Sequence, residues 1–323
     1  MGVCESKENA EADGNAITTN IKDKLTDDKN NNEDKNTINL IYEKSDDEDS
    51  NNNIFGLKFI ENNKDNIQLK INDISTELIE KYNLKEGINN IQLTIKNNLM
   101  NLEEMFYEVT SLKNIEELKY LNTKDVNNFS HMFYGCNSLS DINSLQDWNV
   151  LNGKNFSHMF HGCSSLLDIN SLHNWNVSNG NNFSHMFYCC SKLSDINALK
   201  FWNVSDGNDF SSMFLGCSSL TDISALQNWN VSNGNIFEGM FWGCSTLSDI
   251  SALQNWDVSN GKDFEGMFFK CSALSDIKAL QKWNVSKGKK FRGMLFKCSP
   301  VLDIKILKNW NIQLDNLLEA PKW

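Results

Sequence analysis

Residues 132–158 read MFYGCNSLSDINSLQDWNVLNGKNFSH, and residues 159–185 repeat the phrase as MFHGCSSLLDINSLHNWNVSNGNNFSH. Methionines at intervals of 27 residues carry the phrase along the chain: Met105, Met132, Met159, Met186, Met213, Met240, Met267 and Met294. A fixed period of this length is typical of a solenoid, in which each unit stacks on its neighbours. The repeat therefore predicts a long binding surface and makes a catalytic pocket improbable.

Apolar residues occupy fixed positions when the repeat is counted from each methionine as position 0. Phe follows at +1, Cys at +4, Leu at +7, Ile at +10, Leu at +13, Trp at +16, Val at +18 and Phe at +24. One unit cannot bury so many apolar side chains alone, whereas stacked units bury each at a gain of roughly 1.5–3 kcal/mol. With coils about 4.8 Å apart, eight units make a rod on the order of 40 Å long.

Local patterns predict three pieces in each unit. The F-x-x-M-F-x-x-C stretch has the spacing of a short helix or 3₁₀ turn. The L-x-D-I stretch is predicted as a short strand, and W-N-V-S-N-G as an extended piece ending in a turn where Gly takes a positive φ. The period is too short for a propeller, whose blades need roughly 40–50 residues.

The phrases M-F-x-x-C-x-x-L-x-D-I and W-N-V-S-N together resemble the BspA-like leucine-rich-repeat family of surface and interaction proteins. The resemblance covers residues 101–312. It implies an α/β-type, leucine-rich-repeat-like solenoid of eight 27-residue copies with a binding or adhesive role, and it implies no catalytic residue. Proteins of that family are commonly exported, whereas this chain shows no secretory signal.

Three regions follow from composition. Residues 1–36 form an acidic arm that is predicted to be disordered. Residues 37–100 are predicted to form a small β-rich module with a disordered acidic insert at 44–53, and residues 101–323 the solenoid with a C-terminal cap. The module serves either as a cap on the first repeat, which we prefer because an open end needs covering, or as a recognition domain.

Alternating apolar residues in the module predict strands at 38–42, 54–60, 67–71 and 91–95. Residues 75–82 are predicted as a short helix. At the other end, the tail through Leu314, Leu317, Leu318 and Trp323 is expected to cover the last repeat.

The chain starts Met-Gly-Val-Cys-Glu-Ser, where Gly2 with Ser6 matches the N-myristoylation pattern. One myristoyl chain binds a membrane weakly, so stable anchoring needs a second signal. Residues 1–50 hold six Lys against fourteen Asp and Glu, so a polybasic signal is absent there and palmitoylation of Cys4 is the expected one. These residues predict attachment to the cytoplasmic face of a membrane; a chance Met-Gly start is the alternative.

The charge of the chain excludes some partners. The formal net charge is −12, and residues 1–50 contribute −8 of it. A mildly acidic repeat body disfavours nucleic-acid binding. No sequence motif of a nucleotide-binding, hydrolase or metalloprotease site is found, so we expect neither an enzyme nor a cofactor or small-molecule substrate.

Cys and His recur in the repeat and invite a metal or disulfide interpretation. Seven of the nine Cys hold position +4, and no C-x-x-C pair of the zinc type exists, so we expect buried thiols in the core. His131, His158 and His185 hold position −1 in three consecutive repeats, with His161 close by. Stacked imidazoles about 5 Å apart suit a transition metal, but a recent duplication explains the trio equally well, and no metal site is assigned.

An aspartate column at +9 is the predicted partner-binding face, together with Lys278 and Lys305 at +11: Asp141, Asp168, Asp195, Asp222, Asp249, Asp276 and Asp303. On a strand it would point outward onto a concave face, where like charges on neighbouring strands are destabilising. Capping of the adjacent turn, bound cations or a basic partner would each compensate. Capping is the preferred structural explanation.

The sequence thus predicts a membrane-tethered scaffold that binds a protein partner along the solenoid. The first alternative is a surface adhesin, exported by another route, with glycans on the Asn-Val-Ser and Asn-Phe-Ser triplets. A weaker alternative is a cation-binding repeat protein that uses the Asp or His column.

Overall fold

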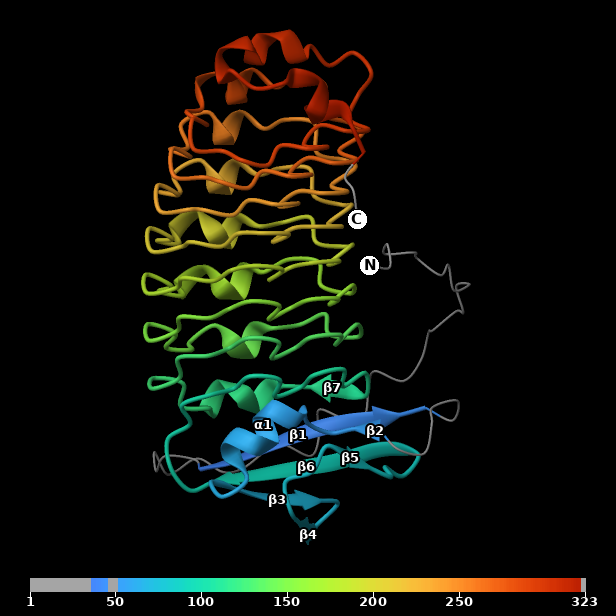
Figure 1. The fold of residues 1–323 in the computed structure, drawn as a ribbon. Helices are drawn as coiled ribbons and strands as arrows, with labels where there is room; N and C mark the ends of the chain where they lie inside the picture. The colour runs from blue at the N-terminus through green and yellow to red at the C-terminus, as the bar shows by residue number, and fades with distance from the viewer. Residues whose placement is uncertain (1–35, 46–51, 321–323) are drawn as a thin grey trace. The chain divides into compact units, whose positions relative to one another are not determined.

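The computed structural model describes residues 36–45 and 52–320. From Asn36 onward the chain forms one compact unit, a repeat solenoid whose coils stack into a rod with a β-rich module at its N-terminal end (Figure 1). The predicted repeat solenoid is therefore confirmed. Gly2, Cys4 and the rest of the predicted acidic arm, except Asn36, lie outside the described residues, as do 46–51 and Trp323.

The module contains a five-stranded antiparallel sheet in the order β4-β3-β6-β1-β7, and a two-stranded pair of β2 with β5. The predicted strands at 38–42, 67–71 and 91–95 are confirmed. The bounds are β1 Thr37–Lys44, β2 Asn52–Asn53, β3 Ile67–Ile71, β4 Ile74–Thr76, β5 Lys81–Tyr82, β6 Gly87–Ile95 and β7 Leu112–Asn114.

Two local predictions in the module are wrong. Residues 54–60 were expected to form a strand, but the helix α1 spans Leu57–Asn63. Phe55, Phe59 and Asn63 are buried at a spacing of four, which is a helical period hidden in an alternating-looking stretch. Residues 75–82, expected to be a helix, instead contain parts of β4 and β5 because their backbone pairs with β3 and β2.

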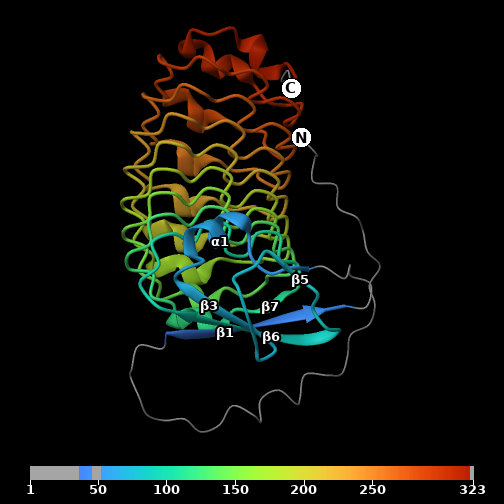
Figure 2. The same ribbon diagram turned by 60° about the horizontal axis from the view of Figure 1, so that its bottom comes forward.

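The module covers the N-terminal end of the rod and shares a strand with it. β7 comes from the first coil, beyond the predicted boundary at residue 100, and pairs with β1. The Gly56 N–H donates to Glu104 O at 3.0 Å, and the Phe55 ring lies 6.2 Å from Phe106. Figure 2 shows the sheet lying across this end. Lys44 and Asn52–Asn53 are strand residues, so the predicted insert at 44–53 is too wide at both ends.

The F-x-x-M-F-x-x-C stretch is neither a helix nor a continuous 3₁₀ helix. Alternate N–H groups donate to the next coil, as in Phe129 N to Asn155 O and Phe133 N to Met159 O, both at 2.9 Å. Intervening N–H groups bond three residues back, as in Met132 N to Phe129 O. The backbone alternates because every second residue must reach the neighbouring coil, which places position −1 and position +3 at positive φ.

In the first coil the predicted strand forms, as β7 at +7 to +9, but in the later coils the L-x-D-I stretch leads into a 3₁₀ helix instead. Within the described residues of these later coils the stretch takes part in a single β-bridge, between Asp168 and Asp195. The 3₁₀ helices are η2 Glu116–Tyr120, η3 Asn143–Leu145, η4 Asn170–Asn174, η5 Asn197–Phe201, η6 Ser224–Leu226, η7 Ser251–Leu253, η8 Lys278–Lys282, η9 Ile304–Trp310 and η10 Leu314–Leu318.

The glycine at +21 is required for space and not for a positive φ as predicted. A Cβ on Gly180 would lie 2.5 Å from Phe183 Cζ and 2.9 Å from Val177 O. The Gly180 N–H closes the turn by donating to Val177 O at 2.8 Å. The glycine therefore lets the phenylalanine at +24 fold back under the turn.

The predicted apolar columns form the core. Successive Phe rings at +1 and at +24 stack with centroids 5.3–5.7 Å apart, and Trp rings at +16 lie 6.3–6.4 Å apart. Each Trp Nε1 donates to the Leu carbonyl of the preceding coil, as in Trp175 to Leu145 O at 2.8 Å. The buried indole N–H is thereby satisfied, which is the condition for burying Trp.

The tail closes the C-terminal end as expected. Gly293 N donates to Asn316 O and Leu295 N to Leu317 O, both at 2.9 Å, so the tail takes the place of a further coil. Leu317 is fully buried. The elements η9 and η10 lie at this end of the rod (Figure 1).

Candidate interaction surfaces

The aspartate column caps the turn that leads into each 3₁₀ helix, and at η9 the Asp is itself the N-cap residue. Every Asp at +9 accepts a hydrogen bond from the N–H two residues later, at 2.7–3.1 Å. Such caps satisfy a backbone donor that the first turn leaves without a partner. The preferred capping explanation is confirmed: one carboxylate oxygen of each residue has a structural role.

The column nevertheless presents charge to solvent. Apart from half-buried Asp195, its members are exposed, and they precede 3₁₀ helices instead of lying on the predicted concave strand face. Lys278 Nζ lies 2.9 Å from Asp276 Oδ2, and this hydrogen bond lowers the pKa of the Asp276 carboxyl. Lys305 is exposed and donates its backbone N–H to Asp303. Whether this face binds a partner remains a prediction.

A second surface consists of stacked rings, which we call the ring patch. It combines position −1 with position +2 over four coils. Its members are His131, His158 and His185 at −1, and Tyr107, Tyr134, His161 and Tyr188 at +2. All seven are half-buried.

Rings in the patch stack within each column along the rod, and rings of the two columns also contact one another. His158 lies 4.3 Å from His131 and 4.4 Å from His185, centroid to centroid. His161 lies 4.2 Å from Tyr134 and 4.3 Å from Tyr188. Neighbours across the two columns are 5.5–5.8 Å apart. Because ring faces cover one another, a partner meets ring edges, hydroxyls and imidazole nitrogens.

Burial keeps these imidazoles neutral. Desolvation, followed by the neighbouring imidazoles, lowers the pKa of His158 to about 3 and that of His161 to about 4. The Nδ1 atoms of His131, His158 and His185 are buried without a hydrogen-bond partner. Among the described residues no group of three or more His, Cys, Asp or Glu is arranged to hold a metal ion.

The backbone explains why His is tolerated at −1. His131, His158 and His185 have φ of 57–58°, a region that His enters more readily than most residues. Later coils place Ser212 and then glycines there. In the coil where Gly239 holds position −1, the ring at +2 is the larger Trp242, which lies 3.2 Å from the site of a Cβ on Gly266 in the next coil.

The +2 column continues toward the C-terminal end with a different character. Trp242 and Phe269 lie 4.1 Å apart, and Phe269 and Phe296 lie 5.4 Å apart. Lys270 Nζ lies 5.5 Å from the centre of the Phe269 ring, and Lys297 Nζ lies 5.6 Å from that of Phe296. Such cation–π contacts add positive charge to this part of the surface.

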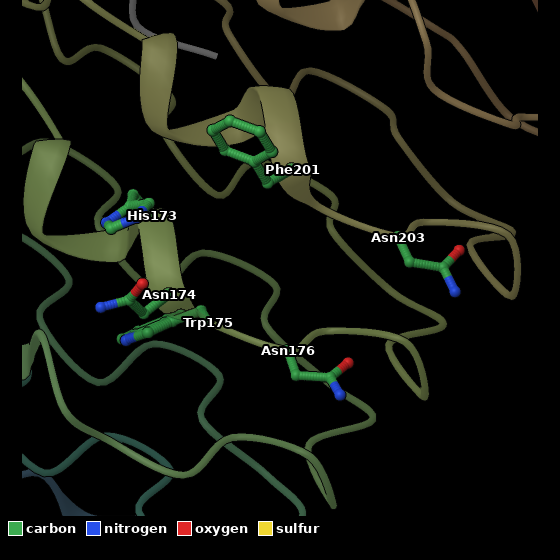
Figure 3. Close-up of a pocket in the computed structure, with 6 residues that line it drawn as sticks. All are labelled: His173, Asn174, Trp175, Asn176, Phe201 and Asn203. Atoms are coloured by element: carbon green, nitrogen blue, oxygen red, sulfur yellow. The ribbon is translucent and has the colours of Figure 1, made fainter.

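An open pocket of about 370 Å³ lies between η4 and η5, lined by His173, Asn174, Trp175, Asn176, Phe201 and Asn203 (Figure 3). Phe201 is 69% exposed and faces His173 edge-on, with ring centroids 6.2 Å apart. The corresponding +15 position is polar in the other coils from Asp147 onward. The pocket has one apolar wall and several side-chain amides.

The cysteine column lies in the core, as predicted. The seven Cys at +4 are free thiols, and each Sγ donates to a Phe carbonyl 30 residues earlier, as in Cys163 to Phe133 O at 3.3 Å. Desolvation raises the pKa of each of these thiols, that of Cys298 to about 12. A buried protonated thiol is a poor nucleophile and a poor metal ligand.

Sequence reasoning noted the His trio but missed the ring patch. Position +2 holds Tyr, His, Leu, Trp or Phe, so it does not read as a fixed letter of the repeat. The signal that could have identified the patch is an aromatic or imidazole side chain at +2 in seven of the eight coils. The lipidation residues Gly2 and Cys4 lie outside the described residues. Within those residues no helix has the length and apolar character to cross a membrane.

The sequence profile described as "Mycoplasma protein of unknown function, DUF285" matches residues 100–225, 168–273 and 208–317. The three overlapping matches together span the coils. No curated protein and no solved structure matches the chain.

Proposed function

The chain belongs to the DUF285 family. We propose that it is a membrane-tethered scaffold that binds another protein along its solenoid. No catalytic role is assigned to any residue. The observation that carries the proposal is the ring patch, because Tyr and other aromatic side chains are enriched at protein interfaces and carry much of their binding energy.

The aspartate column is the second candidate face for the same partner. Its exposed carboxylates, with Lys278 and Lys305, suit electrostatic recognition, which raises the rate of association more than the affinity. The two surfaces predict different behaviour in salt: binding through aspartates weakens as ionic strength rises, whereas binding through ring edges changes little.

Proximity labelling from the full chain in a eukaryotic cell tests the partner proposal. One variant carries Tyr134→Ser and Tyr188→Ser. The other carries Asp168→Asn, Asp222→Asn and Asp249→Asn, in which the side-chain oxygen still caps the helix while the charge is lost. Loss of a labelled protein in one variant assigns the face. Identical labelling by wild type and both variants contradicts binding through either surface.

We further propose that Gly2 is myristoylated and Cys4 palmitoylated, holding the solenoid at the cytoplasmic face of a membrane. The motif and the adjacent Cys support this, since two acyl chains give stable binding where one does not. Labelling with an alkyne myristate, followed by fractionation, tests it. We expect the wild type in the membrane pellet and Gly2→Ala in the supernatant. An unlabelled wild-type chain, or one found outside the cell with glycans, would favour the adhesin instead.

On the finer classification, we infer a BspA-like leucine-rich-repeat solenoid built from 27-residue units. The regular Leu at +7 and +13 and the recurring 3₁₀ helices support it. An experimental structure that shows a continuous parallel sheet along one face of the coils would support the leucine-rich-repeat type.

A further inference from the structure

The last coils of the solenoid carry a concentration of positive charge, which we call the basic end. Residues 278–308 contain nine basic residues and one acidic residue, Asp303, a net charge of +8. The nine are Lys278, Lys282, Lys287, Lys289, Lys290, Arg292, Lys297, Lys305 and Lys308. A window of the same length at the start of the solenoid, residues 101–131, has three basic and six acidic residues, a net charge of −3. The charge of the rod therefore changes sign along its axis.

The basic end acts locally although the whole chain is acidic. The Debye length at physiological ionic strength is about 8 Å. Coils are about 5 Å apart, so charges more than two coils away are largely screened. A surface that touches the last coils together with η10 meets residues 278–320, where nine basic and three acidic residues give a net charge of +6, and not the net charge of −12 of the whole chain.

Most of this charge is not neutralised by salt bridges. Described acidic partners are within 4 Å of three of the nine cations: Asp276 for Lys278, Asp263 for Lys290 and Glu319 for Arg292. The Lys282, Lys289 and Lys308 side chains are exposed. Asp303 uses its carboxylate to cap η9.

Two exposed apolar side chains lie close in sequence to η9 or within η10, the elements that close the rod. Val301 is 76% exposed and Leu318 is 45% exposed. Val301 holds position +7, where the Leu of other coils is buried, but here Leu302 packs against the core in its place. The one-residue shift turns Val301 out to solvent just before η9. Leu318 is the last residue of η10, the element that closes the rod.

We propose that the basic end binds the surface of a bilayer that contains anionic phospholipids. Each Lys or Arg close to such a surface adds a favourable electrostatic contribution, and exposed apolar side chains such as those of Val301 and Leu318 enter the boundary between headgroups and acyl chains. Val301 and Leu318 favour a bilayer over an acidic polymer, which offers no apolar layer. This contact goes beyond the proposed function, because it needs neither an acyl chain nor a protein partner.

The test uses the full chain with Gly2→Ala and Cys4→Ser, so that no acyl chain contributes. The protein is sedimented with vesicles of phosphatidylcholine alone or with added phosphatidylserine. We expect binding only to the phosphatidylserine vesicles, and loss of binding in high salt. Changing Lys282→Glu, Lys289→Glu and Lys308→Glu together should lower the partition coefficient by about a hundredfold.

A matched control changes Lys70→Glu, Lys154→Glu and Lys192→Glu, which alters the net charge equally on exposed residues elsewhere. The control should bind as the parent does, and Val301→Ser should bind several-fold more weakly. Equal binding to both vesicle types, no binding to either, or equal loss in the control overturns the proposal. If no vesicle binds, a cross-link between Lys289 and residues 1–35 would identify the acidic arm as the occupant. None of these results bears on the acylation of Gly2 and Cys4, which is tested by the alkyne myristate experiment.

Discussion

At the residue scale, the glycine at +21 shows how one missing methyl group shapes the six coils that contain it. The substitution Gly180→Ala would place a Cβ 2.5 Å from Phe183 Cζ. We expect a loss of about 1–3 kcal/mol in the free energy of unfolding, the usual cost of overpacking. Chemical denaturation followed by circular dichroism measures it.

The double variant Gly180→Ala with Phe183→Leu is the control for this clash. A leucine does not reach as far as Cζ, so the alanine should cost clearly less in that background than in the wild type. Equal costs in both backgrounds would show that steric contact with Phe183 is not the reason for the glycine.

A second residue-scale prediction separates capping from charge at Asp249. Its Oδ1 accepts from Ser251 N at 2.7 Å. Asp249→Ala should lower the free energy of unfolding by about 1 kcal/mol, whereas Asp249→Asn should change it by only a few tenths, since Asn is an equivalent cap. Denaturant midpoints of the two variants give the comparison. An equal loss in both would mean that the negative charge, not the cap, stabilises the helix.

At the scale of the element, the ring patch couples stability to pH. The folded-state pKa of His158 is about 3 and that of His161 about 4, below the value near 6.5 expected in the unfolded chain. The unfolded state therefore binds more protons between these values, so stability is complete above about pH 6.5 and falls as the pH drops. We expect the melting temperature to decline progressively from pH 6.5 to pH 4.

The other groups that face these imidazoles modify the effect. Glu104 and Glu103 oppose the downward shift at His131, and Asp209 opposes it at His185, whereas imidazole neighbours reinforce it at His158. The variant His158→Asn tolerates the positive φ of this position and removes the titration with the lowest pKa. Its melting temperature should fall less over the same range. A decline as steep as in the wild type would assign the acid sensitivity to other groups.

An element could be predicted from the sequence when the residues that determine it recur at fixed positions of the repeat. Trp175, Phe183 and Cys163 were placed in the core from their spacing alone, because a stacked position must be apolar in every coil. The left-handed backbone at His131 could not be predicted, since it follows from hydrogen bonds to a coil 26 residues away. The helix α1 was missed because Phe55 and Phe59 also fit an alternating pattern.

For the candidate surfaces, sequence reasoning identified the aspartates but not their environment. A strand at L-x-D-I would have left Asp222 unsatisfied beside like charges, whereas the observed turn gives it the Ser224 N–H and hydroxyl as donors. The ring patch was not predicted because Tyr134 and His161 occupy a position of the repeat where the residue type varies. Packing across coils joins them, and this contact cannot be seen in a single unit.

At the scale of the whole molecule, each coil contacts its neighbours through equivalent bonds. One whole coil can therefore be deleted while the equivalent positions of the remaining coils stay aligned. Deleting residues 203–229 joins Trp202 to Asn230 and preserves every column. The shortened chain should unfold in one transition with a smaller denaturant m-value, because less surface becomes exposed. Deleting residues 203–226 instead joins Trp202 to Gln227 and breaks the columns, so it should be far less stable. Equal stability of the two deletions would contradict a 27-residue unit.

The direction of the bonds between coils has a mechanical consequence. They run along the rod, as in Phe133 N to Met159 O and Trp175 Nε1 to Leu145 O. A force that pulls the ends apart loads them one junction at a time, starting at an end, instead of shearing many together. Each coil that peels away releases about 90 Å of extended chain. The rod would yield in small equal steps, as an extensible spacer that limits the tension its ends can transmit.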